Sequence, residues 1–291
     1  GVEDYGLYNV VGGITTLFTF VGGAMTSGAQ RFFAFALGER DQEKLNILFR
    51  TTLSIYLILC LIMLLVFEIF GVWYIESILV VPQGRLAAAH IVFQISVVSF
   101  LLALITIPYN AVVIAHERLS VFAYVSVGSS ILKLVAVFCL RYVDYDSLLI
   151  YALFILLVQT IERLFYQVYC KKTFQECKKW KFTLDRKFSS SLLSYSGYNM
   201  IGSVAIIGRN QGISLVVNLF FGTILNAAHS ISTHIYSVAE QFIGNVFTAS
   251  KPQIIKLYAS KNFSEMWKLV FRSTQLAFYL VMMLSIVLMI E

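Results

Sequence analysis

The sequence contains few charged residues, few prolines and few cysteines. Only 13% of its 291 residues are charged and 58% are hydrophobic, whereas a soluble domain has about 25% charged and about 45–50% apolar residues. Three prolines are too few for long loops, and four cysteines at these spacings fit neither a disulfide framework nor a metal motif. With a mean hydropathy of +0.78, the composition excludes an ordinary soluble domain and predicts a polytopic membrane protein.

Enzymatic signatures are missing as well. The chain has no Walker loop, no GxSxG and no HExxH motif. His229 and His234 are five residues apart, which is about 140° around a helix, so they cannot share a ligand face. We therefore expect neither an enzyme nor a bound cofactor or metal.

Long apolar runs make up most of the chain. A helix that crosses a membrane needs about 20 apolar residues, whereas a barrel strand needs only about 9–11 alternating ones. These runs are longer and apolar on all sides, so the predicted fold is all-α. We expect about eight membrane-spanning helices, at residues 7–36, 46–70, 86–115, 118–140, 146–169, 191–221, 225–249 and 268–290.

Basic residues gather in every second loop between these spans. The other loops carry only Arg85 and Arg141, beside acidic residues. By the positive-inside rule the basic loops are cytoplasmic, so the net charge of +6 reflects topology and we expect no nucleic-acid binding. The basic set consists of Arg40, Lys44, Arg118, Lys171, Lys172, Lys178, Lys179, Lys181, Arg186, Lys187, Lys251, Lys256 and Lys261.

One stretch occurs twice. Residues 20–52 and 242–274 align without a gap, and a stripe of small and polar residues repeats at steps of 4, 3 and 4, which place it on one helix face. The copies begin six spans apart and so run the same way through the membrane, which predicts a parallel repeat of two six-helix halves. The stripe consists of Thr15, Thr19, Gly22 and Thr26 in the first copy and Ser237, Gln241, Gly244 and Thr248 in the second.

The repeat predicts how the chain is divided. We expect an N-terminal lobe at 1–169 that lacks its first helix, a basic cytoplasmic linker at 170–190, and the truncated first part of a C-terminal lobe at 191–291. The alternative is an eight-helix protein whose two stretches are similar by chance. The linker alternates lysines with aromatic residues, so it either lies in the membrane interface, attracted by anionic lipid, or is a solvated connection.

Charged residues inside the spans are the main candidates for function. Lys133 and Arg209 interrupt apolar runs, and each costs about 2.5–3.5 kcal/mol on insertion scales, so each should face protein or water. Glu240 lies deep in the seventh span. These groups either line an aqueous pathway or form structural ion pairs, whereas Arg31 and Arg163 lie near cytoplasmic ends, where snorkelling explains them.

Several segments resemble a known family. They are GVEDYGLYNVVGG, AMTSGAQRFFAFALG, IPYNAVVIAHERLSVFAYVSV, NQGISLVVNLFFG and KPQIIKLYA, and they look like the polysaccharide and O-antigen flippase branch of the multidrug/oligosaccharidyl-lipid/polysaccharide superfamily. The resemblance implies a V-shaped, MATE-like transporter of two lobes and 12 to 14 helices in the bacterial inner membrane. It also implies alternating access that moves a lipid-linked glycan to the outer leaflet for surface polysaccharide biosynthesis, and a cationic lumen to which Lys133 and Arg209 could contribute.

The chemistry of such a substrate suggests which residues bind it. An undecaprenyl-diphosphate oligosaccharide has an anionic pyrophosphate, a polar glycan and an apolar tail, which call for basic groups, hydroxyl and amide groups, and an opening to lipid. A coupling ion, H⁺ or Na⁺, would be a further partner beside membrane lipids. The expected substrate-binding residues are Lys133, Arg209, Glu240, Thr15, Thr19, Asn210, Gln211 and Ser237.

Two other functions stay open at this stage. A drug or cation antiporter of the same fold would need carboxylates to dominate its cavity, and Glu240 is the one deep acidic residue. A non-transporting membrane scaffold would use the same charges as structural pairs.

Overall fold

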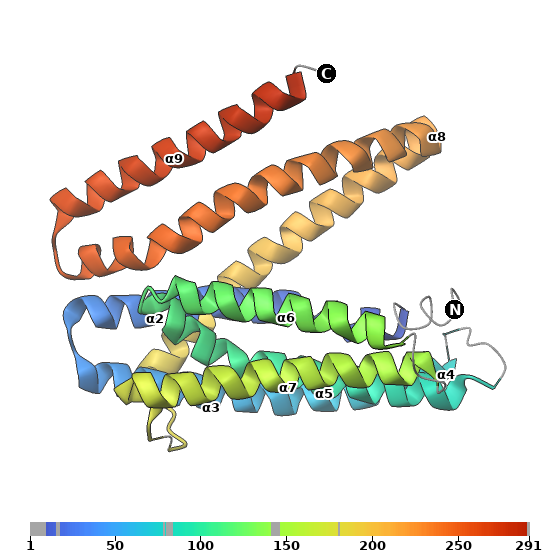
Figure 1. Ribbon diagram of the computed structural model, residues 1–291, viewed down its shortest axis with the longest axis horizontal. Coiled ribbons are helices and arrows are strands. Elements are labelled where there is room, and N and C mark those ends of the chain that lie inside the picture. The colour runs from blue at the N-terminus through green and yellow to red at the C-terminus, as the bar shows by residue number, and fades with distance from the viewer. Residues whose placement is uncertain are drawn as a thin grey trace.

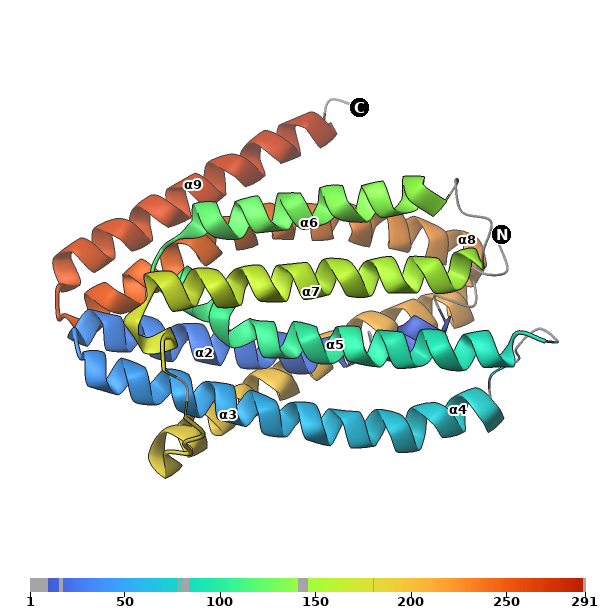
Figure 2. The same ribbon diagram turned by 60° about the horizontal axis from the view of Figure 1, so that its bottom comes forward.

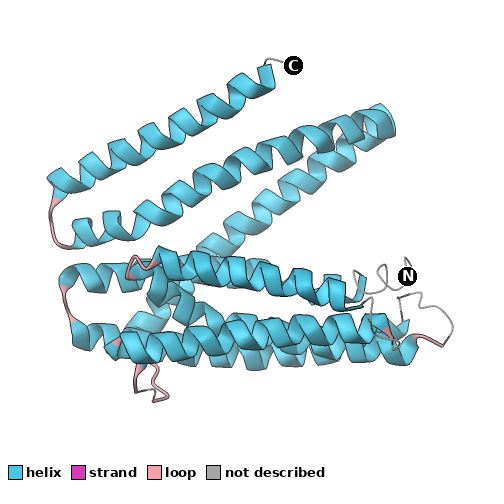
Figure 3. Ribbon diagram, in the orientation of Figure 1, coloured by secondary structure: helices cyan, strands magenta, loops and turns pink. Residues whose placement is uncertain are grey.

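The chain folds as long helices. The computed structural model describes residues 10–15, 18–77, 79, 84–140, 146–179 and 181–289, and within this part of the chain the regular structure is entirely helical (Figure 3). Arg141 and Trp180 lie outside it. The all-α prediction is confirmed.

Seven helices are long and apolar enough to cross a membrane among the described residues, and they match seven of the expected spans. The eighth expected segment, 225–249, is also helical but carries several polar side chains, including Asn226, His229 and Glu240, and is not among them. The seven are Val10–Glu39, Gln42–Ser77, Leu86–Ala115, Leu119–Cys139, Ser147–Thr173, Arg186–Gly222 and Phe263–Ile286.

The helices between residues 19 and 173 pack side by side along one direction, and the helical segments after them are inclined to this bundle (Figures 1 and 2). Two pairs of segments run together: a π-helical turn joins α3 to α4, and α8 is two helices joined at Gly222, whose φ of 79° and ψ of −177° suit glycine. In order the elements are α2 (Thr19–Glu39), α3 (Gln42–Val66), η1 (Phe67–Gly71), α4 (Val72–Ser77), α5 (Leu86–Ala115), α6 (Leu119–Cys139), α7 (Ser147–Thr173), η3 (Gln175–Cys177), α8 (Arg186–Ala259) and α9 (Phe263–Met289).

Two apolar clusters hold α2 to α7 together. One contains Phe33, Phe49 and Tyr109, in which the Phe49 and Tyr109 rings meet edge to face with centroids 5.3 Å apart. The other surrounds Phe67 and Phe100, whose rings also meet edge to face at 5.3 Å. These side chains come from α2, α3, η1 and α5, and Phe188 and Leu192 of α8 also belong to the first cluster. The first cluster therefore joins α2 to α8, the helices that carry the site.

The basic loops lie together. The α2–α3, α5–α6, α7–α8 and α8–α9 connections are at one end of the structure, and the ends of α4 and α6 and the α8 bend are at the other (Figures 1 and 2). At the second end Arg85 pairs with Asp146. We call the first end the basic end. Which side of a membrane it occupies, and the division of the chain into lobes, stay predictions.

Candidate functional site

Helix α2 packs closely against both halves of α8. We call the part of α8 before Gly222 its first limb and the part after Gly222 its second limb. A Cβ atom added at Gly28 would lie 2.9 Å from Leu192 Cδ1, on the first limb, and one at Gly38 would lie 2.6 Å from the carbonyl oxygen of Lys256, on the second. Gly28 leaves room for side chains of α8 and Gly38 for its backbone, as small residues do where helices pack closely. The two limbs of α8 therefore converge on α2, and the second limb reaches it at the basic end.

This packing places one cation over an aromatic side chain, on which the charge of a second cation also acts. The guanidinium carbon of Arg31, on α2, lies 4.8 Å from the ring centre of Tyr195, on the first limb of α8. Asn199 Nδ2 donates to the backbone carbonyl oxygen of Tyr195 at 3.1 Å. Arg31 also interacts with the Tyr195 side chain, and the charge of Lys251, on the second limb, acts on it as well. We call these four residues the cation cluster.

The cation cluster is suited to an anion. Arg31 and Lys251 are exposed, and neither forms an ion pair with any carboxylate among the described residues. The guanidinium group of an arginine binds a carboxylate or a phosphate through two parallel hydrogen bonds, and the ammonium group of a lysine adds a point charge. The tyrosine hydroxyl and the Asn199 amide are further donors for the oxygens of a phosphate.

Several expected site residues lie along the same face of α8. Arg209 is 14 residues after Tyr195, about 40° short of four full turns, so it points in a similar direction about 21 Å further along. Its Nε and Nη2 atoms both donate to Asn210 Oδ1 at 3.3 Å. Gln211, in contrast, is about 160° around from Tyr195. The first limb therefore carries Arg209 and Asn210 toward the cation cluster's side and Gln211 toward the opposite side.

The second limb shows a similar arrangement. Glu240 is 11 residues before Lys251, about 20° past three full turns, so the two share a face. Glu240 is exposed and forms no ion pair with a described residue. Ser237, on the same face, donates to the carbonyl oxygen of His234 at 2.8 Å. The expected alternative, a structural pair between Glu240 and a cation, is absent from the described residues.

Lys133 lies apart from these residues. It is exposed on α6, a helix that packs mainly on α7 and α5. The structure therefore does not bring Lys133 together with Arg209 on α8, although the sequence suggested that both serve one site.

Thr15 and Thr19 line a separate cavity. It has a volume of about 330 Å³ and none of its lining residues is charged. Thr15 is buried and donates to the carbonyl oxygen of Gly12 at 2.8 Å. The sequence did not single out three further polar residues of this cavity, because they are uncharged and lie within apolar runs: Ser96, Ser99 and Gln159.

Two arginines for which the sequence suggested snorkelling also lie over aromatic rings. Arg31 lies over a ring of another helix. The guanidinium of Arg163 lies 4.6 Å from the ring centre of Tyr109, and its Nη1 atom is buried without a hydrogen-bond partner. Their positions near helix ends suggested snorkelling, and only the packing of the helices reveals the aromatic partners.

The described residues hold no group of three or more His, Cys, Asp or Glu side chains that could bind a metal ion. No protein-family model matches the sequence, and no curated protein matches it.

Solved structures share its fold. A crystal structure of MATE in the straight conformation superposes with a TM-score of 0.76 at 15% identity, over 96% of this chain and 67% of that chain. An outward-facing multidrug resistance MATE family transporter of the MOP superfamily gives 0.71 at 14% identity, with the same coverage. A MOP superfamily transporter from Pyrococcus furiosus Vc1, described by a binding pocket of reverse polarity that suggests a different function, gives 0.74 at 15% identity over 96% and 67%.

At these identities the likeness shows the fold. The MATE-like fold expected from the sequence is confirmed, and the chain is a multi-pass membrane protein. It spans about two thirds of the length of these structures.

Proposed function

We propose that this chain belongs to a transporter that moves a lipid-linked anionic glycan, such as an undecaprenyl-diphosphate oligosaccharide, from the cytoplasmic to the outer leaflet of a bacterial inner membrane by alternating access. The observation that carries the proposal is the cation cluster. Arg31 lies over Tyr195, the charge of Lys251 also acts on that side chain, and no described carboxylate forms an ion pair with either cation, as suits a diphosphate.

Polar residues outside the cluster suit the remaining parts of such a substrate. Hydroxyl and amide groups bind sugars without needing a charge, and the uncharged cavity beside Thr15 and Thr19 supplies such groups. Arg209 would extend the positive face of α8 toward the end opposite the basic end. Lys133 lies on α6, apart from these residues, and its role in binding stays a prediction. The polar groups proposed to meet the glycan are Thr15, Thr19, Asn199, Asn210 and Ser237, whereas Gln211 points to the opposite side of α8.

The alternative is a drug or cation antiporter, which the fold fits equally well. An organic cation needs carboxylates in its pathway, and Glu240 is the single acidic residue of α8. The Pyrococcus furiosus transporter is described by a pocket of reverse polarity, so pocket charge differs among proteins of this fold. Glu240 is also the residue that we propose for a coupling ion, H⁺ or Na⁺.

The full-length protein in vesicles separates these functions. We expect it to move a fluorescent polyprenyl-diphosphate oligosaccharide between leaflets. The measurement is the fraction of the fluorescence that a quencher added outside the vesicles removes. Export of ethidium driven by a H⁺ or Na⁺ gradient, without movement of the lipid, would instead support the antiporter. Movement of neither compound would support the scaffold.

The proposed direction of transport requires the basic end to be cytoplasmic. Single cysteines at Lys179 and Lys261, both exposed at that end, should not react with an impermeant maleimide in intact cells. A cysteine at Ser77, exposed at the other end, should react. The four native cysteines are first replaced by alanine, and labelling at Lys179 from outside would reverse the orientation.

A further inference from the structure

The connection between α7 and α8 folds back along the side of α3 (Figures 1 and 2). Three hydrogen bonds hold it there. Arg50 Nε donates to the carbonyl oxygen of Lys179 at 3.2 Å, and the backbone N–H groups of Thr183 and Asp185 donate to the Ser54 and Thr51 hydroxyls at 3.1 and 3.3 Å. The connection therefore has a fixed position on the flank of the structure.

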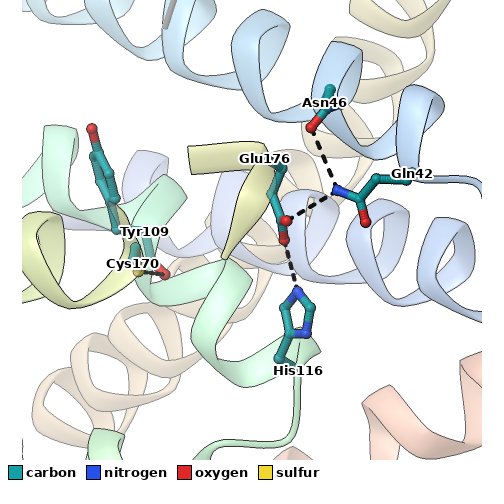
Figure 4. A network of polar contacts seen from close by, with 6 residues as sticks. All are labelled: Gln42, Asn46, Tyr109, His116, Cys170 and Glu176. Carbon is teal, nitrogen blue, oxygen red and sulfur yellow. Dashed lines mark hydrogen bonds and ion pairs between the residues drawn. The ribbon is translucent and has the colours of Figure 1, made fainter. Parts of the chain in front are cut away.

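A buried carboxylate anchors the start of the connection (Figure 4). Glu176 is 3% exposed and contacts His116 Nε2 at 2.7 Å, while Gln42 Nε2 donates to it at 3.3 Å. The ring of Phe174 stacks on His116 with centroids 4.1 Å apart. Burial alone would raise the pKa of Glu176, but the hydrogen bonds from His116, from its own backbone and from Gln42 hold that pKa below its ordinary value.

Every exposed charged side chain of the connection and of the adjoining helix ends is basic. The two acidic residues of the connection are both engaged: Glu176 is buried, and Asp185 accepts from the Phe188 N–H group at 2.7 Å as the cap of α8. Two large apolar side chains, Phe182 and Leu184, are 54% and 47% exposed beside the charges. The basic surface consists of the exposed residues Lys171, Lys172, Lys178, Lys179, Lys181, Arg186 and Lys187.

The position along α3 places this surface near lipid headgroups. The span Gln42–Ser77 has 36 residues, a length of about 54 Å, whereas the hydrocarbon core of a bilayer is about 30 Å thick. A centred helix therefore extends about 12 Å beyond the core at each end. Arg50, which bonds the connection, is eight residues from Gln42 and so lies at about this boundary.

We propose that residues 171–179 and 181–187 form a folded docking surface for anionic phospholipid headgroups, with Phe182 and Leu184 inserted at the acyl boundary. Lysines near a membrane are attracted to anionic lipid, and exposed apolar side chains beside them enter the interface. Because hydrogen bonds already order the backbone, binding loses little conformational entropy. The proposal requires only that the chain spans a membrane, so it stands or fails independently of the transported substrate.

A spin label on Phe182→Cys measures the depth directly. The full-length protein, with its native cysteines changed to alanine, is placed in nanodiscs of phosphatidylcholine alone or with one quarter phosphatidylglycerol. We expect the ratio of oxygen to nickel-chelate accessibility to rise at least threefold with the anionic lipid. A label on Leu157→Cys, exposed in the middle of α7, is the matched control and should report the same depth in both lipids.

Charge removal tests the cause of the lipid dependence. The triple change Lys178→Gln, Lys179→Gln and Lys181→Gln should abolish the rise at Phe182→Cys, and Lys178→Gln alone should reduce it if the triple variant does not fold. Glu176→Gln should weaken the anchor and make the label more mobile. Equal accessibility in the two lipids, or a rise that survives the triple change, would overturn the proposal. It would also be overturned if the nickel chelate lost access to the label only when an acidic protein was added, and not with anionic lipid.

Discussion

Transport of a diphosphate-linked glycan should fall at least tenfold when either Arg31 or Lys251 is changed to glutamine. A charge-assisted hydrogen bond contributes about 1.5–3 kcal/mol, and about 1.4 kcal/mol corresponds to one factor of ten in rate. Arg31 lies over Tyr195 and the Lys251 charge acts on the same side chain from another part of the chain, so the double variant should lose more than either single one. The measurement is the initial rate of leaflet exchange in vesicles.

Matched variants separate this effect from a general change in charge. Lys268→Gln removes an equally exposed cation whose partner, Glu265, lies on the same helix at 2.7 Å, a contact that contributes little, so its rate should match the unchanged protein. Arg31→Lys should recover part of the activity, because the point charge remains while the fork is lost. Arg209→Gln should lower transport in the same direction, with partial recovery in Arg209→Lys. A double Arg31→Gln and Lys251→Gln variant with full transport would contradict the placement of the anion.

Gly38→Leu should also abolish transport, through the packing of α2 on α8. A Cβ atom at this position would lie 2.6 Å from the carbonyl oxygen of Lys256 and 2.7 Å from the Cβ atom of Ala259. Neither atom belongs to a flexible side chain that could turn away, so the two helices would have to separate. Lys256 also pairs with Glu117 of the α5–α6 turn at 2.7 Å. Forcing these segments apart should hold the basic end of the structure open. Gly38 lies about 10 Å beyond Arg31 along α2, so the opening would be close to the cation cluster.

Cysteine labelling tests this opening. A cysteine at Asn199, in the cation cluster, should react faster from the basic end in the Gly38→Leu protein than in its parent. Gly197→Leu is the control, because a Cβ atom there meets nothing within 4 Å. Normal transport by a folded Gly38→Leu protein, or unchanged labelling at Asn199, would show that this contact does not close the pathway.

The sequence predicts the helical architecture well, because a membrane restricts what the chain can do. Runs longer than about 20 apolar residues leave helices as the practical solution, and the charge of each loop indicates the end at which it lies. The segment around His229 and Glu240 shows the limit of this reasoning, since it is helical but more polar than the other spans. Its place in the fold depends on α2 and α9 rather than on its own hydropathy.

The site is harder to predict, because it depends on which helices meet. Lys251 lies just before Pro252, which suggests a loop, yet Pro252 lies inside α8 and Lys251 acts on Tyr195. Arg31 is near a helix end, and its partner is more than 160 residues away in sequence. Small residues do carry a signal: Gly28 and Gly38 mark where α2 approaches α8, but the identity of the facing helix requires the structure.

Equilibrium binding to the full-length protein tests the central claim most directly. The ligands are a polyprenyl diphosphate and the organic cation tetraphenylphosphonium, each titrated against the unchanged protein and the Arg31→Gln, Lys251→Gln double variant in nanodiscs without anionic lipid. We predict that the unchanged protein binds the diphosphate at least tenfold more tightly than the double variant does, and that inorganic pyrophosphate competes. Equal diphosphate affinity in both proteins, together with tighter binding of the cation that depends on Glu240, would contradict the account and favour the antiporter.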